Sequence, residues 1–140
     1  MPNFLITNDL EQLKGYHIAS IDGLKAHTLR GFYEEIAKVL RFPEYFGFNL
    51  DSLDEMLNDL SWLEHKKIAI CINNSESFIE KERNPDKLPT IFNLLDATCE
   101  DWEWSDEEDD RPKKELIVVF SPSERITQLL DGQEISYEVR

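Results

Sequence analysis

The sequence contains no long hydrophobic run and no recognisable targeting segment. A membrane span needs about 20 consecutive apolar residues, and no stretch of this 140-residue chain approaches that length. Residues 1–9 lack the basic start and the apolar core of a secretory signal peptide. No lipidation motif is present at the N-terminus. We therefore expect a cytoplasmic protein that does not engage membranes.

Cysteine and histidine are too few and too scattered to suggest a metal site. Cys71 and Cys99 each lie in an apolar pattern, which is typical of buried free thiols in a reducing compartment. The histidines lie far apart, so no Cys/His spacing indicates zinc. Glycine-rich phosphate loops and the serine, cysteine or histidine motifs of hydrolases are also missing. The sequence predicts no cofactor, no metal and no enzymatic activity.

Basic residues are scarce, since 15 Lys and Arg stand against 29 Asp and Glu, and the formal net charge is −14. Such a surface repels the phosphates of nucleic acids and anionic lipids, so we expect neither as a partner. It attracts basic proteins and can speed their capture by electrostatic steering. The charge alone fits two interpretations, a merely soluble surface or a surface arranged to meet a basic protein.

The chain also lacks internal repeats and Gly-rich, Ser-rich or Pro-rich linkers, so we expect residues 1–140 to form a single domain. Apolar runs and helical spacing of apolar residues predict the elements. Strands are predicted at residues 16–22, 68–72 and 116–120, and helices at 28–40, 49–60, 89–102 and 123–130, with a short helical turn in 75–82. Apolar strands separated by helices are typical of an α/β fold with a small parallel sheet. Residues 135–139 alternate as an added C-terminal edge strand would, and the acid-rich residues 100–110 predict an exposed loop.

The predicted helix at residues 49–60 separates its apolar and acidic residues completely. At 3.6 residues per turn, one side gathers Leu50, Leu53, Met56, Leu57 and Leu60, and the other gathers Asp51, Asp54, Glu55, Asn58 and Asp59. Carboxylates four residues apart repel each other by a few tenths of a kcal/mol, and no base offsets that cost. The acidic side is either a solvated surface or a docking surface for a cationic site.

The loop before this helix is rich in aromatic residues, namely Phe42, Tyr45, Phe46 and Phe48. Tyr45 is the candidate for an exposed contact, because a phenol favours a wet boundary and tyrosine is enriched in binding hot spots. An acidic helix beside an exposed tyrosine suits a cleft built from Arg, Lys and His to hold phosphates, since carboxylates can replace those phosphates.

Residues 42–53, Phe-Pro-Glu-Tyr-Phe-Gly-Phe-Asn-Leu-Asp-Ser-Leu, resemble a segment of the barstar family of intracellular ribonuclease inhibitors. That family segment reads Leu-Pro-Glu-Tyr-Tyr-Gly-x-Asn-Leu-Asp-Ala-Leu, in the same loop-to-helix setting. The resemblance implies a three-stranded parallel sheet covered by helices. It also implies a core of about residues 16–121, with extensions at residues 1–15 and 122–140.

The same resemblance implies roles for individual residues. Tyr45 and Asp51 match residues that contact the nuclease, and Glu55 matches the acid that enters its active site as a phosphate mimic. Gly47 matches the glycine that lets the loop backbone approach the partner. One further acid comes from the later helix, where Asp96 and Glu100 are both candidates. Asp54 and Asp59 complete the expected surface. Glu55 departs from the family's shorter aspartate, and Asp54 replaces a tryptophan.

The resemblance and the charge pattern together predict an inhibitor, in the role of an immunity protein or antitoxin. It would form a heterodimer with a basic toxin nuclease, a ribonuclease if the resemblance extends to the target, and block the active site. The alternative is an acidic interaction module or nucleic-acid mimic that engages another basic protein.

Overall fold

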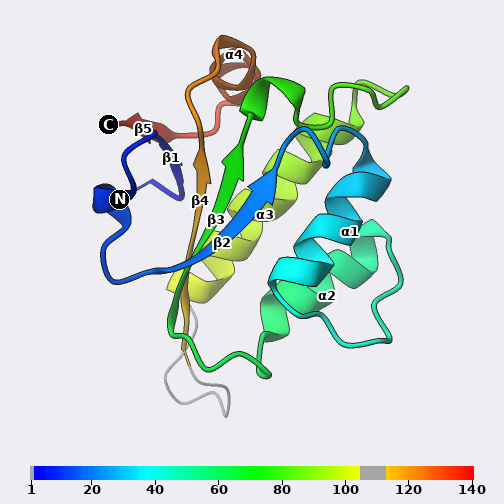
Figure 1. The fold of residues 1–140 in the computed structure, drawn as a ribbon, viewed down its shortest axis with the longest axis vertical. Helices are drawn as coiled ribbons and strands as arrows, with labels where there is room; N and C mark the ends of the chain where they lie inside the picture. The colour runs from blue at the N-terminus through cyan, green and yellow to red at the C-terminus, as the bar shows by residue number, and fades with distance from the viewer. Residues whose placement is uncertain (1, 105–112) are drawn as a thin grey trace.

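The structure, a computed structural model, describes residues 2–104 and 113–140. Within these residues the chain folds around a five-stranded sheet. Its strands are β1 (Phe4–Ile6), β2 (His17–Asp22), β3 (Lys67–Asn73), β4 (Glu115–Phe120) and β5 (Tyr137–Val139). They lie in the order β2-β3-β4-β1-β5 (Figure 1), and every neighbouring pair is parallel.

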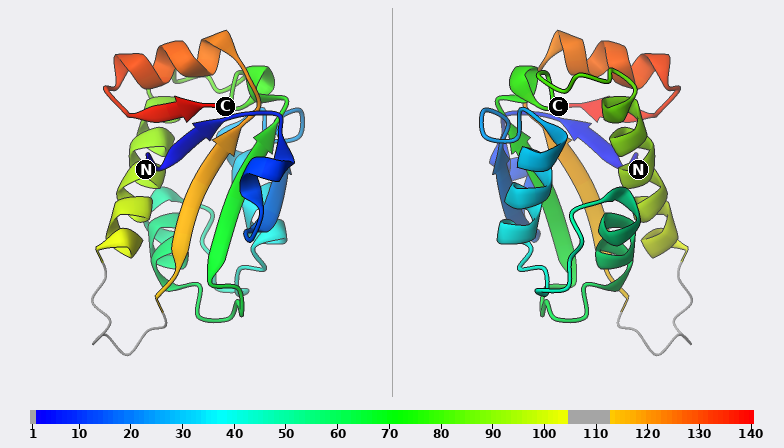
Figure 2. Two further views of the ribbon diagram at one scale, coloured as in Figure 1. Left: turned by 90° about the vertical axis from the view of Figure 1, so that its left-hand side faces the viewer. Right: turned by 90° about the vertical axis from the view of Figure 1, so that its right-hand side faces the viewer.

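Three helices cover one face of this sheet (Figure 2). They are α1 (Leu29–Val39), α2 (Leu50–Asp59) and α3 (Lys87–Glu103). A fourth helix, α4 (Glu124–Gly132), lies across one end of the sheet, and the 3-10 turn η1 (Leu10–Leu13) lies on the opposite face. A second 3-10 turn, η2 (Ser75–Ser77), follows β3. None of the helices in the described residues is long and apolar enough to cross a bilayer.

Polar side chains determine where three of the helices begin. Thr28, Asn49 and Ser123 each precede a helix in extended conformation, and their side-chain oxygens accept a hydrogen bond from the backbone N–H three residues later. Such N-caps satisfy one of the backbone donors that a helix leaves free at its start.

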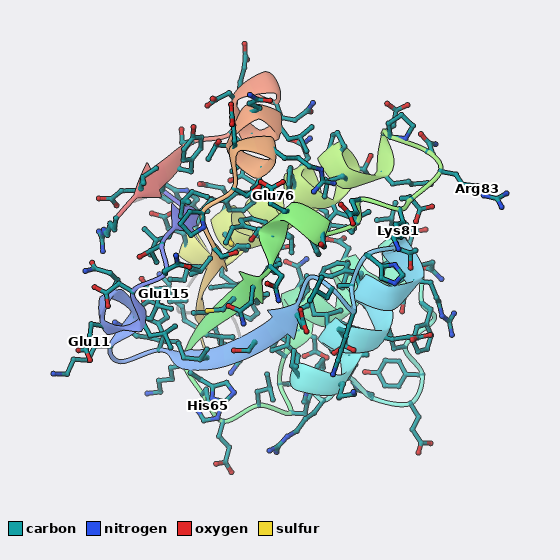
Figure 3. All side chains as sticks on the ribbon, turned by 45° about the horizontal axis from the view of Figure 1, so that its top comes forward. Glu11, His65, Glu76, Lys81, Arg83 and Glu115 are labelled. Atoms are coloured by element: carbon teal, nitrogen blue, oxygen red, sulfur yellow. The ribbon has the colours of Figure 1, made fainter. Side chains whose placement is uncertain are left out.

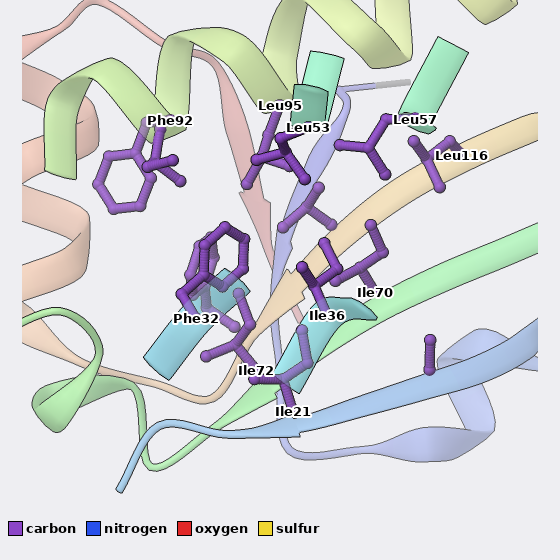
Figure 4. Packing of buried hydrophobic residues seen from close by; sticks show 14 of the residues in the cluster. Ile21, Phe32, Ile36, Leu53, Leu57, Ile70, Ile72, Phe92, Leu95 and Leu116 are labelled. Carbon is purple, nitrogen blue, oxygen red and sulfur yellow. The ribbon is translucent and has the colours of Figure 1, made fainter. Parts of the chain in front are cut away.

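The main core lies between the sheet and helices α1, α2 and α3 (Figure 4). Phe4, Phe92 and Phe120 form an edge-to-face cluster in it, with ring centroids 5.5 to 6.2 Å apart. A smaller cluster covers the other face of the sheet, where Leu13 of η1 packs with Cys71 and its neighbours. Each face of the sheet is therefore covered, as purely parallel sheets require.

The structure confirms the predicted α/β fold with a parallel sheet. It also confirms the helices predicted between the strands and the added edge strand, which is β5. Cys71 and Cys99 are buried free thiols, as predicted, and burial raises the pKa of the Cys71 thiol to about 11.

Two details differ from the sequence predictions. Strand β1 was not predicted, because three apolar residues are too few to show a periodicity. Helix α3 extends to Glu103, so Glu100 lies in the helix and not in the predicted loop 100–110. The rest of that loop, residues 105–110, lies outside the described residues.

We predict that Phe4→Ala destabilises the protein by about 3–5 kcal/mol, the usual cost of emptying a buried phenylalanine site. Phe4 has no exposed surface and touches Phe92 and Phe120. Urea unfolding followed by circular dichroism measures the change. The control is Leu10→Ala, whose side chain is 64% exposed and should cost less than about 0.5 kcal/mol. Equal small losses would show that β1 is not part of the cooperative core.

Candidate functional site

Helix α2 presents its carboxylates to solvent because its apolar side chains face the sheet. Leu53, Met56 and Leu57 are fully buried. We call the opposite side the acidic face, made of Asp51, Asp54, Glu55 and Asp59. Asp59 is half-buried, and the other three are exposed. The sequence therefore predicted the composition of this surface correctly, because burial of one stripe fixes the direction of the other.

No Lys or Arg of the described residues lies within ion-pair distance of the acidic face. The ion pairs between described residues are elsewhere, at Arg30–Glu34, Lys67–Glu115 and Arg140–Glu138. Asp54 accepts a hydrogen bond from the amide of Asn58 at 3.0 Å, which holds the side chain without neutralising it. A cation arriving from outside meets no competitor among the described residues.

The turn into α2 is closed by three hydrogen bonds. The backbone N–H of Gly47 donates to Ser52 Oγ at 2.8 Å, and the backbone N–H of Ser52 donates to Asn49 Oδ1 at 2.8 Å. Asn49 Nδ2 donates back to the Gly47 carbonyl at 3.1 Å. A Cβ atom on Gly47 would lie 2.9 Å from Asn49 Nδ2, so a larger residue would displace the capping side chain. These bonds hold Gly47 at the start of the acidic face.

The aromatic residues of the loop divide into an inner and an outer group. Phe46 is buried, and its ring centroid lies 4.9 Å from that of Phe42 and 4.7 Å from that of Phe48. Tyr45 is 65% exposed. Because Phe46 is held in the core, its neighbour Tyr45 is turned outward, next to the start of α2. The structure thus exposes Tyr45 in the loop before α2 and holds Gly47 at the start of that helix.

The two candidates from the later helix lie elsewhere. The amide of Asn3 donates to Asp96 Oδ1 and to Glu100 Oε1, each at 2.9 Å, so both carboxylates face the start of β1. The flank of α3 that meets α2 is marked by Trp102, whose indole N–H donates to the Leu57 carbonyl at 2.8 Å. Asp96 and Glu100 therefore point away from the acidic face of α2.

Sequence reasoning did not single out two exposed residues at the end of α3, of which one lies on the side of α2 and the other on the side of Glu100. Asp101 is exposed and directly precedes Trp102 in α3. At a rotation of 100° per residue, this places Asp101 on the side of α3 that faces α2. Trp104 is 79% exposed, and its indole N–H donates to Glu100 Oε2 at 3.0 Å. The apolar stripe of α3 was visible in the sequence, but which of its flanks meets α2 is a tertiary property.

The site offers exposed carboxylates and a phenol, a set of groups suited to receiving Arg and Lys side chains. Among the described residues, no three His, Cys, Asp or Glu side chains come together in a way that could hold a metal ion.

Residues 16–125 match the family described as Barstar (barnase inhibitor). The chain belongs to the barstar family. Members of this family inhibit barnase-type nucleases. The match therefore assigns the chain to a family of inhibitors without identifying a specific target. No curated protein matches the sequence. The barstar-family match contains the loop and α2, whereas β1, η1 and β5 lie outside it.

We predict that Asn49→Ala lowers the free energy of unfolding by about 1 kcal/mol, the typical cost of losing an N-cap. The substitution removes the bonds to Ser52 and Gly47. Urea unfolding measures the loss. Asn8→Ala is the matched control, because Asn8 is exposed and its side chain makes no hydrogen bond to a described residue. A loss at Asn49 no larger than that at Asn8 would contradict the capping role.

Proposed function

We propose that this barstar-family protein is an intracellular immunity protein or antitoxin that binds the active site of a basic toxin nuclease, most simply a ribonuclease. The observation that carries the proposal is the acidic face of α2, which has no neutralising partner among the described residues and lies beside the exposed Tyr45. A helix adapted for stability alone would pair these charges.

The chemistry of nuclease active sites supports this assignment. Such sites hold phosphates with Arg, Lys and His, and carboxylates form the same charge-assisted hydrogen bonds with those side chains. Glu55 lies in the middle of the acidic face, with Asp51 one turn before it and Asp59 one turn after. Glu55 reaches into the cationic cleft, Asp51 and Asp59 engage its rim, and Tyr45 packs beside them.

We predict that Glu55→Gln weakens inhibition at least 100-fold, which corresponds to about 2.7 kcal/mol. Removing one charge of a desolvated pair leaves the partner's cation buried without compensation and typically costs 2–5 kcal/mol, a range that draws on barstar and barnase themselves. The measurement is the inhibition constant against the nuclease that co-purifies with the chain from its native host. Circular dichroism confirms that the variant folds.

The control is Glu11→Gln, which removes the same charge from η1 on the opposite face of the sheet (Figure 3). That change should weaken inhibition less than about threefold, because a remote charge acts only through long-range attraction. Equal, small losses for both variants would leave only a diffuse acidic surface. A co-purifying partner without nuclease activity would support an acidic interaction module instead.

We also predict that the association rate falls at least tenfold when the ionic strength rises from about 10 mM to about 150 mM. The screening length shrinks from about 30 Å to about 8 Å over that range, and steering between a chain of charge −14 and a basic nuclease weakens accordingly. Stopped-flow fluorescence gives the rate constants. A rate that stays constant with salt would contradict electrostatic steering.

A further inference from the structure

A cationic hollow of about 470 Å³ lies at the start of helix α1, beside the loop that leads into α2. Its charged lining residues are Arg30, Lys81, Arg83 and Glu82. Lys81 and Arg83 both extend from the segment after η2, at the opposite end of the molecule from His65 (Figure 3). Cations outnumber carboxylates here, although acids are almost twice as frequent as bases in the whole chain.

The cationic side chains of the hollow make few stabilising interactions with the described residues. The side chains of Lys81 and Arg83 are exposed and make no ion pair or hydrogen bond with any described residue. The Arg30 guanidinium lies 4.2 Å above the ring of Phe48, which holds it at the mouth of the hollow. Its ion pair with Glu34 is exposed on both sides, and such pairs contribute little.

The one carboxylate of the hollow already has a structural task. Glu82 Oε2 accepts a hydrogen bond from the backbone N–H of Leu29 at 2.8 Å and so serves the first turn of α1. A carboxylate at that position is stabilised by the helix dipole. The charges of Lys81 and Arg83 are therefore left for a ligand.

Tyr33 adds an uncharged hydrogen-bond donor to the lining of the hollow. Tyr33 is only 4% exposed and lines the hollow, and its hydroxyl makes no hydrogen bond to any described residue. The hydroxyl is not fully buried, because His27 Nδ1 is the buried side-chain polar atom that lacks a partner among the described residues. Burial and the charge of Glu82 raise the pKa of the phenol, so it remains a hydrogen-bond donor. The hydroxyl is therefore open to the hollow and can donate a hydrogen bond to an oxygen acceptor that enters it.

The hollow is continuous with the surface that we propose for the nuclease. Phe48 lines the hollow and belongs to the loop that carries Tyr45 and Gly47. A partner seated on Tyr45 and the start of α2 would therefore lie next to Phe48 and the hollow that it lines.

We propose that the partner nuclease places an acidic side chain in this hollow, against Arg83, Lys81 and the phenol of Tyr33. This inference rests on the proposed function and adds that the docking surface is bipolar. The partner needs a cationic cleft for α2 and a carboxylate beside that cleft. Basic proteins without the carboxylate would bring like charges together at Lys81 and Arg83, which disfavours them.

The proposal is tested by whether a charge reversal in the hollow weakens or strengthens binding. Arg83→Glu makes the chain more acidic, so attraction by net charge alone would strengthen binding to a basic nuclease. If an acidic side chain of the partner occupies the hollow, Arg83→Glu instead places a second negative charge beside it. We therefore expect this variant to raise the dissociation constant at least tenfold. The matched control is Lys14→Glu, which makes the same charge change at an exposed lysine beside η1. It should bind as tightly as the wild type or slightly more tightly.

Tyr33→Phe provides a second measurement that does not alter charge. Loss of the phenolic hydroxyl should raise the dissociation constant about fivefold, mainly through faster dissociation, while circular dichroism and urea unfolding show an intact fold. An unchanged dissociation constant for either Arg83→Glu or Tyr33→Phe would overturn the proposal.

Glu55→Gln in the same assay separates this proposal from the proposed function. If Glu55→Gln weakens binding and Arg83→Glu does not, only the acidic side chain in the hollow is wrong. If neither variant weakens binding, the nuclease-inhibitor function itself fails. Inorganic phosphate is titrated into the isotope-labelled protein alone. Saturable shifts at Tyr33 and Arg83 at millimolar phosphate would identify the hollow as a site for a free anion and would contradict the proposal.

Discussion

Burial of the apolar side of α2 against the sheet is the constraint on which the acidic face, our proposed binding surface, depends. Leu53, Met56 and Leu57 lose their exposed surface there, and each such side chain contributes about 1.5–3 kcal/mol. The repulsion between carboxylates one turn apart costs only a few tenths of a kcal/mol per pair. The core therefore holds the acids in an outward orientation, where no Lys or Arg of the described residues pairs with them. Under the function that we propose, this is the orientation in which a cationic cleft meets them.

Rigidity of the entry into α2 matters as much as its charge. Gly47, Asn49 and Ser52 hold one another through three hydrogen bonds, and Phe46 fixes the loop in the core. A surface that is ordered before binding loses less conformational entropy when its partner arrives. The exposed Tyr45 and the first carboxylate of α2 are thus presented in one arrangement.

The surface is not uniformly acidic, and this affects which partners fit it. The acidic face lies along α2, whereas Lys81 and Arg83 surround a hollow at the start of α1. Attraction over long distances follows the net charge of −14, but discrimination at contact follows the local arrangement. The asparagine Asn3, just before β1, meanwhile holds Asp96 and Glu100 away from α2.

The sequence by itself determined the parallel α/β fold, the helix that carries the acids and the cap at Asn49, because these follow from local periodicity and side-chain chemistry. It also located residues 42–53 through their resemblance to the barstar family. Only the tertiary structure decided that Phe4–Ile6 forms a strand next to β4, since a three-residue strand is stabilised by its neighbours. The tertiary structure also decided which flank of α3 meets α2 and which residues line the hollow at Tyr33. Residues distant in sequence form these features, and no local pattern encodes which of them meet.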